Sequence, residues 1–190
     1  MEHRQLDELV LRIAVGDRAA FAALYEEMKS PVFGLALAVL RRRDEAEDVM
    51  QDTFLRVWNA AGQHRPGEDA RAWVMTIARN LSYMAIRRRR PTDEVDEQTP
   101  NPRSSVDGAV DRVLLDQLFT ALDDVERQIV VLYAVGGYSH KEIAAILDKP
   151  HATIRWKFRR ALRKLSDRMA ESDAHRAQDG VLPTEKGGPL

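Results

Sequence analysis

A proline-rich acidic segment divides this 190-residue chain into two short parts. Residues 91–108 read PTDEVDEQTPNPRSSVDG, with three prolines, almost no apolar side chains and no helical repeat. Such a stretch cannot bury enough apolar surface to form a core, so we expect a mobile linker over 91–111. One large core is therefore excluded. We expect two small domains, at 1–90 and 112–170, and a disordered tail at 171–190.

The spacing of apolar residues predicts an all-α fold, because no useful period-2 pattern occurs in either part. In the first part, we expect helices over about 6–16, from Asp17 to Pro31, and over about 32–40, 44–60 and 70–90. Asp17 can cap the second helix, and Pro31 is expected to break or kink it. In the last helix, the side chains expected inside are Trp73, Ile77, Leu81, and Met84 or Ala85.

The second part predicts a helix-turn-helix. An amphipathic stretch over 113–122 precedes a helix that begins with a capping box, Asp123 with Glu126. Ser139 with Glu142 forms a second capping box before a short helix, and a tight turn at 148–150 leads to a longer helix over about 152–169. The residues expected on the buried face of this last helix are Ile154, Phe158, Ala161, Leu162 and Leu165.

The last helix carries seven cations against one acid, Asp167. Arg155, Trp156 and Arg159 are expected to face outward near its start, where a recognition helix meets base edges in the major groove. Lys157, Arg160 and Arg163 are better placed for phosphates. A solvated basic face is the alternative, but the capping box, turn and cations together favour DNA binding. Trp156 either contacts DNA or covers a neighbouring helix.

The formal net charge of −1 would argue against a nucleic-acid binder if the charge were evenly spread. It is not evenly spread. Residues 1–90 carry +2 and residues 112–170 carry +4, whereas 91–111 carry −5 and 171–190 carry −2. Two mildly basic parts therefore flank one acidic segment.

Several classes of protein are disfavoured by what the sequence lacks. It contains no cysteine, its five histidines have no HxxxH or HExxH spacing, and it has no glycine-rich phosphate loop or nucleophile elbow. We therefore expect neither an enzyme nor a bound cofactor or metal. The longest apolar run is about half a membrane span, and the N-terminus does not read as a signal peptide. We expect a soluble cytoplasmic protein without membrane insertion.

Four blocks, in this order around an acidic linker, resemble the extracytoplasmic-function (ECF) sigma factors of the bacterial sigma-70 family. They are GDRAAFAALYEEM (16–28), DEAEDVMQDTFLRVW (44–58), RAWVMTIARNLSYMAIRRRR (71–90) and LDDVERQIVVLYAVGGYSHKEIAAILDKPHATIRWKFRRALRKL (122–165). The resemblance implies an alternative sigma factor that binds core RNA polymerase and recognises the −35 and −10 promoter elements. It implies a region 2-like domain at 1–90 and a region 4-like domain at 112–170.

The resemblance also implies which residues carry each role. Core polymerase binding, through the β′ clamp coiled coil, falls on an acidic helix: Asp44, Glu45, Asp48, Gln51, Asp52 and Leu55. Contacts to the −10 element fall on His64, Arg65, Arg79, Asn80, Arg87 and Arg88. Contacts to the −35 element fall on His151, Thr153, Arg155, Trp156, Lys157, Arg159, Arg160 and Arg163. The further partners implied are the β flap of the polymerase and an anti-sigma factor.

Two positions depart from the family pattern. Met84 stands where the family commonly has Asp, which bears on the details of −10 recognition, and Asp148 stands where it commonly has Gly. The main alternative function is a conventional helix-turn-helix regulator with an N-terminal sensing or dimerisation domain. That alternative does not explain the acid-rich block at 44–52 or the arginine cluster at 87–90.

Overall fold

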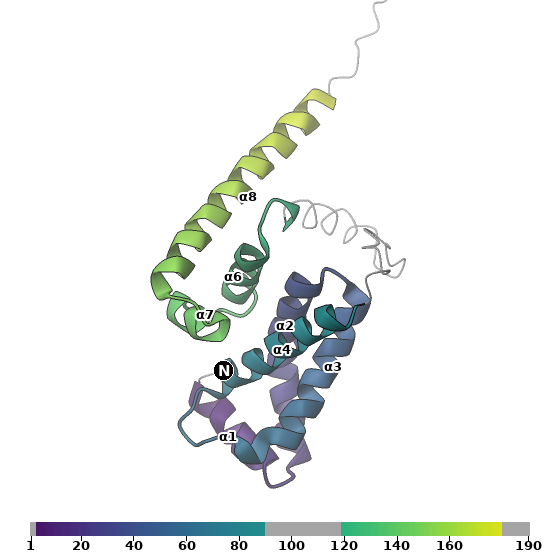
Figure 1. Ribbon diagram of the computed structural model, residues 1–190, viewed down its shortest axis with the longest axis vertical. Coiled ribbons are helices and arrows are strands. Elements are labelled where there is room, and N and C mark those ends of the chain that lie inside the picture. Colours follow the sequence, from purple (N-terminus) through teal and green to yellow (C-terminus); the bar gives the residue numbers. More distant parts are fainter. Residues whose placement is uncertain (1–2, 90–118, 180–190) are drawn as a thin grey trace, which may run out of the picture.

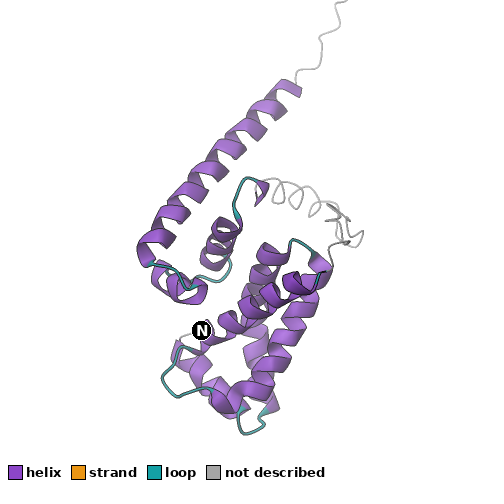
Figure 2. Cartoon of the chain, viewed as in Figure 1, coloured by secondary structure: helices purple, strands orange, loops and turns teal. Residues whose placement is uncertain are grey.

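The computed structural model describes residues 3–89 and 119–179, and every element in these ranges is a helix (Figure 2). The expected all-α class is therefore confirmed. The elements are α1 (His3–Ile13), α2 (Arg18–Leu40), α3 (Arg43–Ala60), the short 3₁₀ helix η1 (Ala61–Gln63), α4 (Ala70–Arg88), α6 (Asp124–Ala134), α7 (His140–Leu147) and α8 (His151–Asp179). The expectations for the linker at 91–111, for 113–118 and for 180–190 lie outside the described residues.

Side-chain caps explain where several helices begin. The Asp17 carboxylate accepts hydrogen bonds from the backbone of Ala19 and Ala20 at the start of α2, as expected. Both expected capping boxes are present, at Asp123 before α6 and at Ser139 before α7. These caps satisfy backbone N–H groups that have no partner within the helix. The starts of α6 and α7 therefore follow from the sequence.

Pro31 does not break α2, which runs without interruption from Arg18 to Leu40. The expectation of two separate helices was wrong. Proline removes one backbone hydrogen bond and costs about 3 kcal/mol or more in a helix interior. Here the helix is buried on both sides of it, with Met28, Val32 and Leu35 at most 1% exposed. This burial keeps the helix continuous across Pro31.

The core of the first helical group lies between α2, α3 and α4, with α1 packed against α2 and α4. On α4, the buried apolar positions are Ala70, Val74, Met75 and Ala78. The expected register was therefore wrong by about one residue. Trp73, Ile77, Leu81 and Ala85 are only half-buried at the edges of this face, and Met84 is 38% exposed. The shift arises because α4 packs against four helices, α1, α2, α3 and α7, rather than against one.

The two helical groups lie against each other, with α2 beside α6 and α4 beside α7 (Figure 1). Gly34 allows the close approach of α2 and α6, because a Cβ at this position would lie 3.0 Å from Val131 Cγ1. The Arg71 guanidinium lies 4.0 Å from the centre of the buried Tyr138 ring and donates to the Gly136 carbonyl. The sequence predicted two tethered domains but not this contact.

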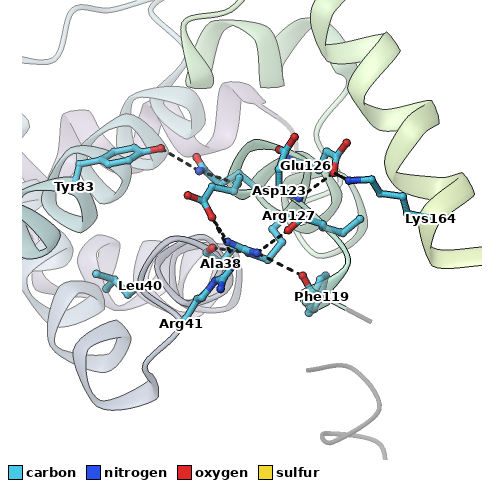
Figure 3. Close-up of polar contacts among 12 residues, drawn as sticks. Ala38, Leu40, Arg41, Tyr83, Phe119, Asp123, Glu126, Arg127 and Lys164 are labelled. Atoms are coloured by element: carbon cyan, nitrogen blue, oxygen red, sulfur yellow. Dashed lines mark hydrogen bonds and ion pairs between the residues drawn. The ribbon is translucent and has the colours of Figure 1, made fainter. Parts of the chain in front are cut away.

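Polar contacts reinforce the same junction. The Arg127 guanidinium donates to the carbonyl of Ala38 on α2, with Nε 3.2 Å from the oxygen (Figure 3). The Gln128 amide donates to the Tyr83 hydroxyl of α4 at 3.1 Å. Arg127 is almost fully buried, with 4% of its side chain exposed. Burial, together with the nearby Arg41, lowers the pKa of Arg127.

The last helix, α8, is longer than expected. It was predicted over about 152–169 with a disordered tail from 171, but it continues to Asp179, so the tail prediction was wrong for 171–179. Its C-terminal half extends away from the rest of the described chain (Figure 1). Ile154 and Ala161 are buried as expected, and Phe158 and Leu165 are half-buried. Leu162 is 47% exposed, so its expected burial was wrong.

Candidate nucleic-acid interface and partner surface

The predicted helix-turn-helix is formed by α7, a tight turn and α8. The turn begins at Asp148, whose backbone is left-handed with φ 50° and ψ 55°. Asn and Asp tolerate this conformation better than most residues other than glycine. The Lys149 N–H then donates to the Ala144 carbonyl at 3.0 Å. Buried Ile143 and Ile146 of α7 join Ile154 of α8 in the core, which fixes the angle between the helices.

One face of α8 is open to solvent near the start of the helix. Arg155, Arg159 and Arg163 follow one another at four-residue spacing and are all exposed. Trp156 lies beside them and is 48% exposed. His151 is also exposed at the first position of the helix, whereas Thr153 is half-buried. This face offers guanidinium groups and an aromatic ring at the part of a recognition helix that reaches base edges.

Three other cations of α8 pair with acids of the same domain. The Lys157 ammonium is 2.7 Å from Asp123 Oδ2, and the Lys164 ammonium is 2.7 Å from Glu126 Oε2. Arg160 Nε is 3.3 Å from Glu126 Oε1. Lys157 and Arg160 were predicted as phosphate contacts, but both are paired with acids of the same domain. Sequence reasoning missed these pairs because the acids precede their paired cations by 34 to 38 residues.

A ring cluster adjoins the recognition face. His140 stacks on Tyr133 with ring centres 5.5 Å apart, and Phe158 packs against both rings. Burial lowers the pKa of His140, and the positive charges of His151 and Arg155 lower it further. The neutral imidazole is therefore favoured here. No sequence pattern singled out His140, because the cluster joins three different helices.

On α4, the residues predicted for the −10 element do not share one environment. Asn80, Arg87 and Arg88 are exposed, and helical spacing places Asn80 on the same face as Arg87. Arg79 is half-buried and lies 5.2 Å from the centre of the Tyr83 ring. Met84 is exposed on the Asn80 face, one turn along the helix.

His64 and Arg65 precede α4 and differ in exposure. Arg65 is exposed in the loop. The His64 side chain is fully enclosed, with its ring 5.2 Å from the Trp73 ring and Nε2 3.7 Å from Asp7 Oδ1. The prediction that His64 contacts DNA therefore does not fit this structure, in which the residue packs beneath the loop. Trp73 is its packing partner, which agrees with a core role for that ring.

The acidic helix α3 carries one exposed face. Asp44, Asp48, Gln51, Asp52 and Leu55 are exposed and recur at helical spacing, and Leu55 is 61% exposed. Asp48 and Asp52 have no ion pair with any cation of the described ranges. A hydrogen bond from Arg42 lowers the pKa of Asp44. The face combines free carboxylates with one apolar side chain, which suits a basic protein partner.

Glu45 does not belong to that face. Its carboxylate is 2.6 Å from Arg89 Nη2, and Arg89 also donates to the Leu40 carbonyl at 2.8 Å. The pair joins the start of α3 to the end of α4. Glu45 was predicted as a polymerase contact, and Arg89 belongs to the arginine cluster after Asn80, but both are used within the fold.

No group of three or more His, Cys, Asp or Glu residues within the described part of the chain could hold a metal ion. None of the helices that the structure describes is both long and apolar enough to cross a membrane.

Comparisons with known proteins identify the family of the chain. Residues 24–92 match the family model for sigma-70 region 2, and residues 112–165 match the model for sigma-70 region 4. ECF RNA polymerase sigma factor SigK of Mycobacterium tuberculosis is 34% identical over 179 residues, covering 84% of this chain and 91% of SigK. SigK of Mycolicibacterium vanbaalenii is 34% identical over 181 residues, covering 84% of this chain and 88% of that protein.

Two solved structures share the fold over most of the chain. CnrH, solved in complex with the cytosolic domain of CnrY, has a TM-score of 0.66 at 26% identity and covers 90% of this chain and 98% of CnrH. RpoE of Bartonella quintana, solved with the anti-sigma factor NepR, has a TM-score of 0.62 at 25% identity and covers 79% of this chain and 96% of RpoE. The chain therefore belongs to the ECF sigma factors of the sigma-70 family, which are alternative sigma factors that direct the initiation of transcription.

Proposed function

We propose that this sigma factor binds core RNA polymerase through α3 and reads its promoter at two places, through α4 and α8. One observation carries the proposal: a single chain presents both an exposed acidic face on α3 and an exposed arginine face on α8. A conventional regulator needs only the second surface. The domain at 1–90 then serves polymerase binding and the −10 element, 112–170 serves the −35 element, and 91–111 links them.

Reading of the −35 element falls to the exposed face of α8. An arginine can bond guanine O6 and N7 with two parallel hydrogen bonds, and each such pair discriminates against a wrong base by about 1–3 kcal/mol. Arg155 and Arg159 occupy the positions nearest the start of the helix. Arg163 lies one turn further on and suits a phosphate. His151 and Trp156 complete the exposed surface.

Recognition of the −10 element falls to the exposed face of α4. The Asn80 amide offers a donor and an acceptor together, which suits the edge of an unstacked base. Arg65, Arg87 and Arg88 are exposed cations that can hold the displaced backbone. Met84 replaces an acid of the family pattern beside Asn80, so the base preference here is set by an apolar contact.

The separation of the two promoter elements supports a change in arrangement on the promoter. They lie roughly 25 base pairs apart, which is about 85 Å along B-DNA at about 3.4 Å per base pair. In the structure α4 contacts α7 directly, and α4 itself, with 19 residues, is only about 28 Å long. The contact between the helical groups must therefore open before both elements are read together.

The remaining partners follow from the family. The α3 face fits the β′ clamp coiled coil, and the domain at 112–170 fits the β flap. The solved relatives CnrH and RpoE were captured with CnrY and NepR, and we propose that an anti-sigma factor likewise holds this chain inactive. The chain acts in the cytoplasm with RNA polymerase and performs no catalysis of its own.

Run-off transcription with core RNA polymerase on a genomic library, followed by mapping of the start sites, tests the function directly. A sigma factor yields a common pair of elements upstream of the starts and binds DNA detectably only with core enzyme. A conventional regulator instead binds its promoter alone and is not retained by core enzyme in a pull-down. That outcome would overturn the proposal.

Two charge changes test the surfaces. Asp48→Arg should weaken competition for core enzyme, whereas Glu8→Arg, at an exposed position of α1, should not.

Arg155→Ala or Arg159→Ala should each cost about 1–3 kcal/mol of promoter recognition. Arg168→Ala, at an exposed position further along α8, is the matched control. Unchanged promoter preference in both arginine variants would contradict the assignment of α8.

A further inference from the structure

Two acidic residues at the start of α6 form ion pairs with three cations of α8. Lys157, Arg160 and Lys164 are spaced i, i+3 and i+7, so they lie along one face of α8. Asp123 pairs with the first of them, and Glu126 pairs with the other two. Figure 3 shows Asp123, Glu126 and Lys164 in this arrangement. We call these five residues the α6–α8 clamp.

The clamp is built on a capping box. Asp123 Oδ1 accepts the backbone N–H of Glu126 at 2.8 Å, and Glu126 Oε2 accepts the backbone N–H of Asp123 at 2.9 Å. These bonds fix both carboxylates before the cations of α8 reach them. Burial raises the pKa of Asp123, but hydrogen bonds from Lys157 and from the Glu126 backbone outweigh it and lower the pKa overall.

Because the clamp is largely buried, it restricts the placement of α8 on α6. The Glu126 side chain is fully buried, and only 18% of the Lys157 side chain is exposed. A buried carboxylate needs compensating charge and hydrogen bonds, so Glu126 strongly favours the one placement of α8 that supplies them. An apolar contact alone tolerates small rotations of a helix, because it has no preferred direction.

The clamp and the exposed arginines occupy different sides of α8. At about 100° per residue, the middle of the clamp face lies roughly 135° from the middle of the face formed by Arg155, Arg159 and Arg163. The clamp also spans seven residues, or about 10 Å of the axis. A rotation of α8 that breaks the clamp therefore turns the arginines away from their direction.

We propose that Asp123 and Glu126 are positioning residues for −35 recognition, which set the rotation of α8 on α6 without touching DNA. The inference rests on the proposed reading of the −35 element by α8. It distinguishes two groups of cations on this helix. Arg155, Arg159 and Arg163 meet DNA, whereas Lys157, Arg160 and Lys164 hold the helix that presents them.

The test separates the clamp from the caps. Asp123→Ser keeps a good N-cap oxygen but removes the charge that pairs with Lys157. Glu126→Gln keeps an acceptor for the Asp123 N–H but removes the other charge. The double variant is combined with core polymerase and assayed by transcription from three promoters: the mapped one, one altered at −35 and one altered at −10. Glu171→Gln removes an exposed pair with Arg168 on the same helix and is the matched control.

The expected result is a loss of −35 discrimination by a factor of about 5 to 150, the value of one bidentate contact. Discrimination at −10 should stay within about twofold, and the control should change neither. A purely structural role would lower transcription from all three promoters equally. The ratio of the mapped promoter to the −35-altered one, and its ratio to the −10-altered one, would then stay unchanged, which would overturn the proposal. Should the double variant fail to fold, Asp123→Ser alone is judged by the same ratios.

The arginine variants keep this proposal distinct from the proposed function. When Arg155→Ala lowers −35 discrimination but the clamp variants do not, only the positioning role is wrong. When neither does, reading by α8 is itself wrong. Salt dependence gives a second measure, because each lost phosphate contact reduces the slope of log affinity against log salt by about 1. Arg163→Gln should reduce this slope, and Lys157→Gln should not.

Discussion

Arg127 offers a sharp test of what holds the two helical groups together. Its guanidinium is 4% exposed and donates to the carbonyls of Ala38, at 3.2 Å, and Leu122, at 2.9 Å. It also pairs with Asp124. Replacing it by methionine keeps most of the volume but leaves two buried carbonyl groups without this donor. Hydrogen bonds to charged groups contribute about 1.5–3 kcal/mol each, so we expect Arg127→Met to lower the free energy of unfolding by about 3–5 kcal/mol.

Urea unfolding measures this change. With a slope near 2 kcal/mol per molar urea, the midpoint should fall by about 2 M. Trp58 and Trp73 report on the first helical group and Trp156 on the second, so fluorescence and circular dichroism together show whether the groups unfold in one step. Arg163→Met is the matched control, since Arg163 is exposed, and should change stability by less than about 0.5 kcal/mol. A loss below about 1 kcal/mol for Arg127→Met would show that the cost of burying its charge cancels its contacts, and would refute the reasoning.

Three further changes have definite expected outcomes. Asp148→Gly should raise the free energy of unfolding by about 1 kcal/mol, because glycine adopts the left-handed backbone there without strain; an unchanged urea midpoint would contradict this. Folding lowers the pKa of His140, so the stability that this residue contributes is complete above its ordinary pKa of 6.5 and is lost as pH falls through the folded value. His140→Gln should therefore reduce the fall in urea midpoint between pH 7.5 and 5.5. Equal falls in the variant and the unmodified protein would count against this. Gly34→Leu should press on Val131, separate α2 from α6 and increase the radius of gyration in X-ray scattering, whereas Gly62→Leu, with open space around it, should not; equal radii would argue against the contact.

Local chemistry made the helix starts predictable. The caps at Asp17, Asp123 and Ser139 each depend on a residue and a backbone group no more than three positions away. The same holds for the turn after α7, where Asp148 takes the left-handed conformation that its side chain tolerates. Features that depend only on residues a few positions apart can be predicted from the local sequence without tertiary information. The all-α class followed for the same reason.

Features that depend on distant neighbours were not predictable. Local propensity argued for a break at Pro31, but packing on both sides of α2 overrides it. The register of α4 was uncertain by one residue because Trp73 and Val74 head two adjacent apolar stripes, and only the positions of α1, α2 and α3 decide between them. His64 was expected to contact the −10 element, yet it packs against Trp73 and Asp7.

The candidate site shows the same division. Exposed carboxylates on α3 and exposed arginines on α8 agree with their predicted faces, because a helical repeat with an apolar side also defines a polar side. The polar side of α8 nevertheless contains two faces, and its sequence does not distinguish them. Lys157 and Arg159 differ in role only because Asp123 lies beside one of them. Pairing, rather than residue type, separates cations that meet DNA from cations that hold the fold.

This separation changes how the net charge of −1 bears on DNA binding. Non-specific affinity for DNA grows with the number of phosphates that a protein neutralises. Three of the eight cations on α8 are paired with acids at the start of α6, so they add little to that number. The free chain should therefore bind DNA weakly at physiological salt. Its selectivity must come from the direction of a few exposed arginines, and for that reason a device that fixes the rotation of α8 has more effect on promoter choice than additional positive charge would have.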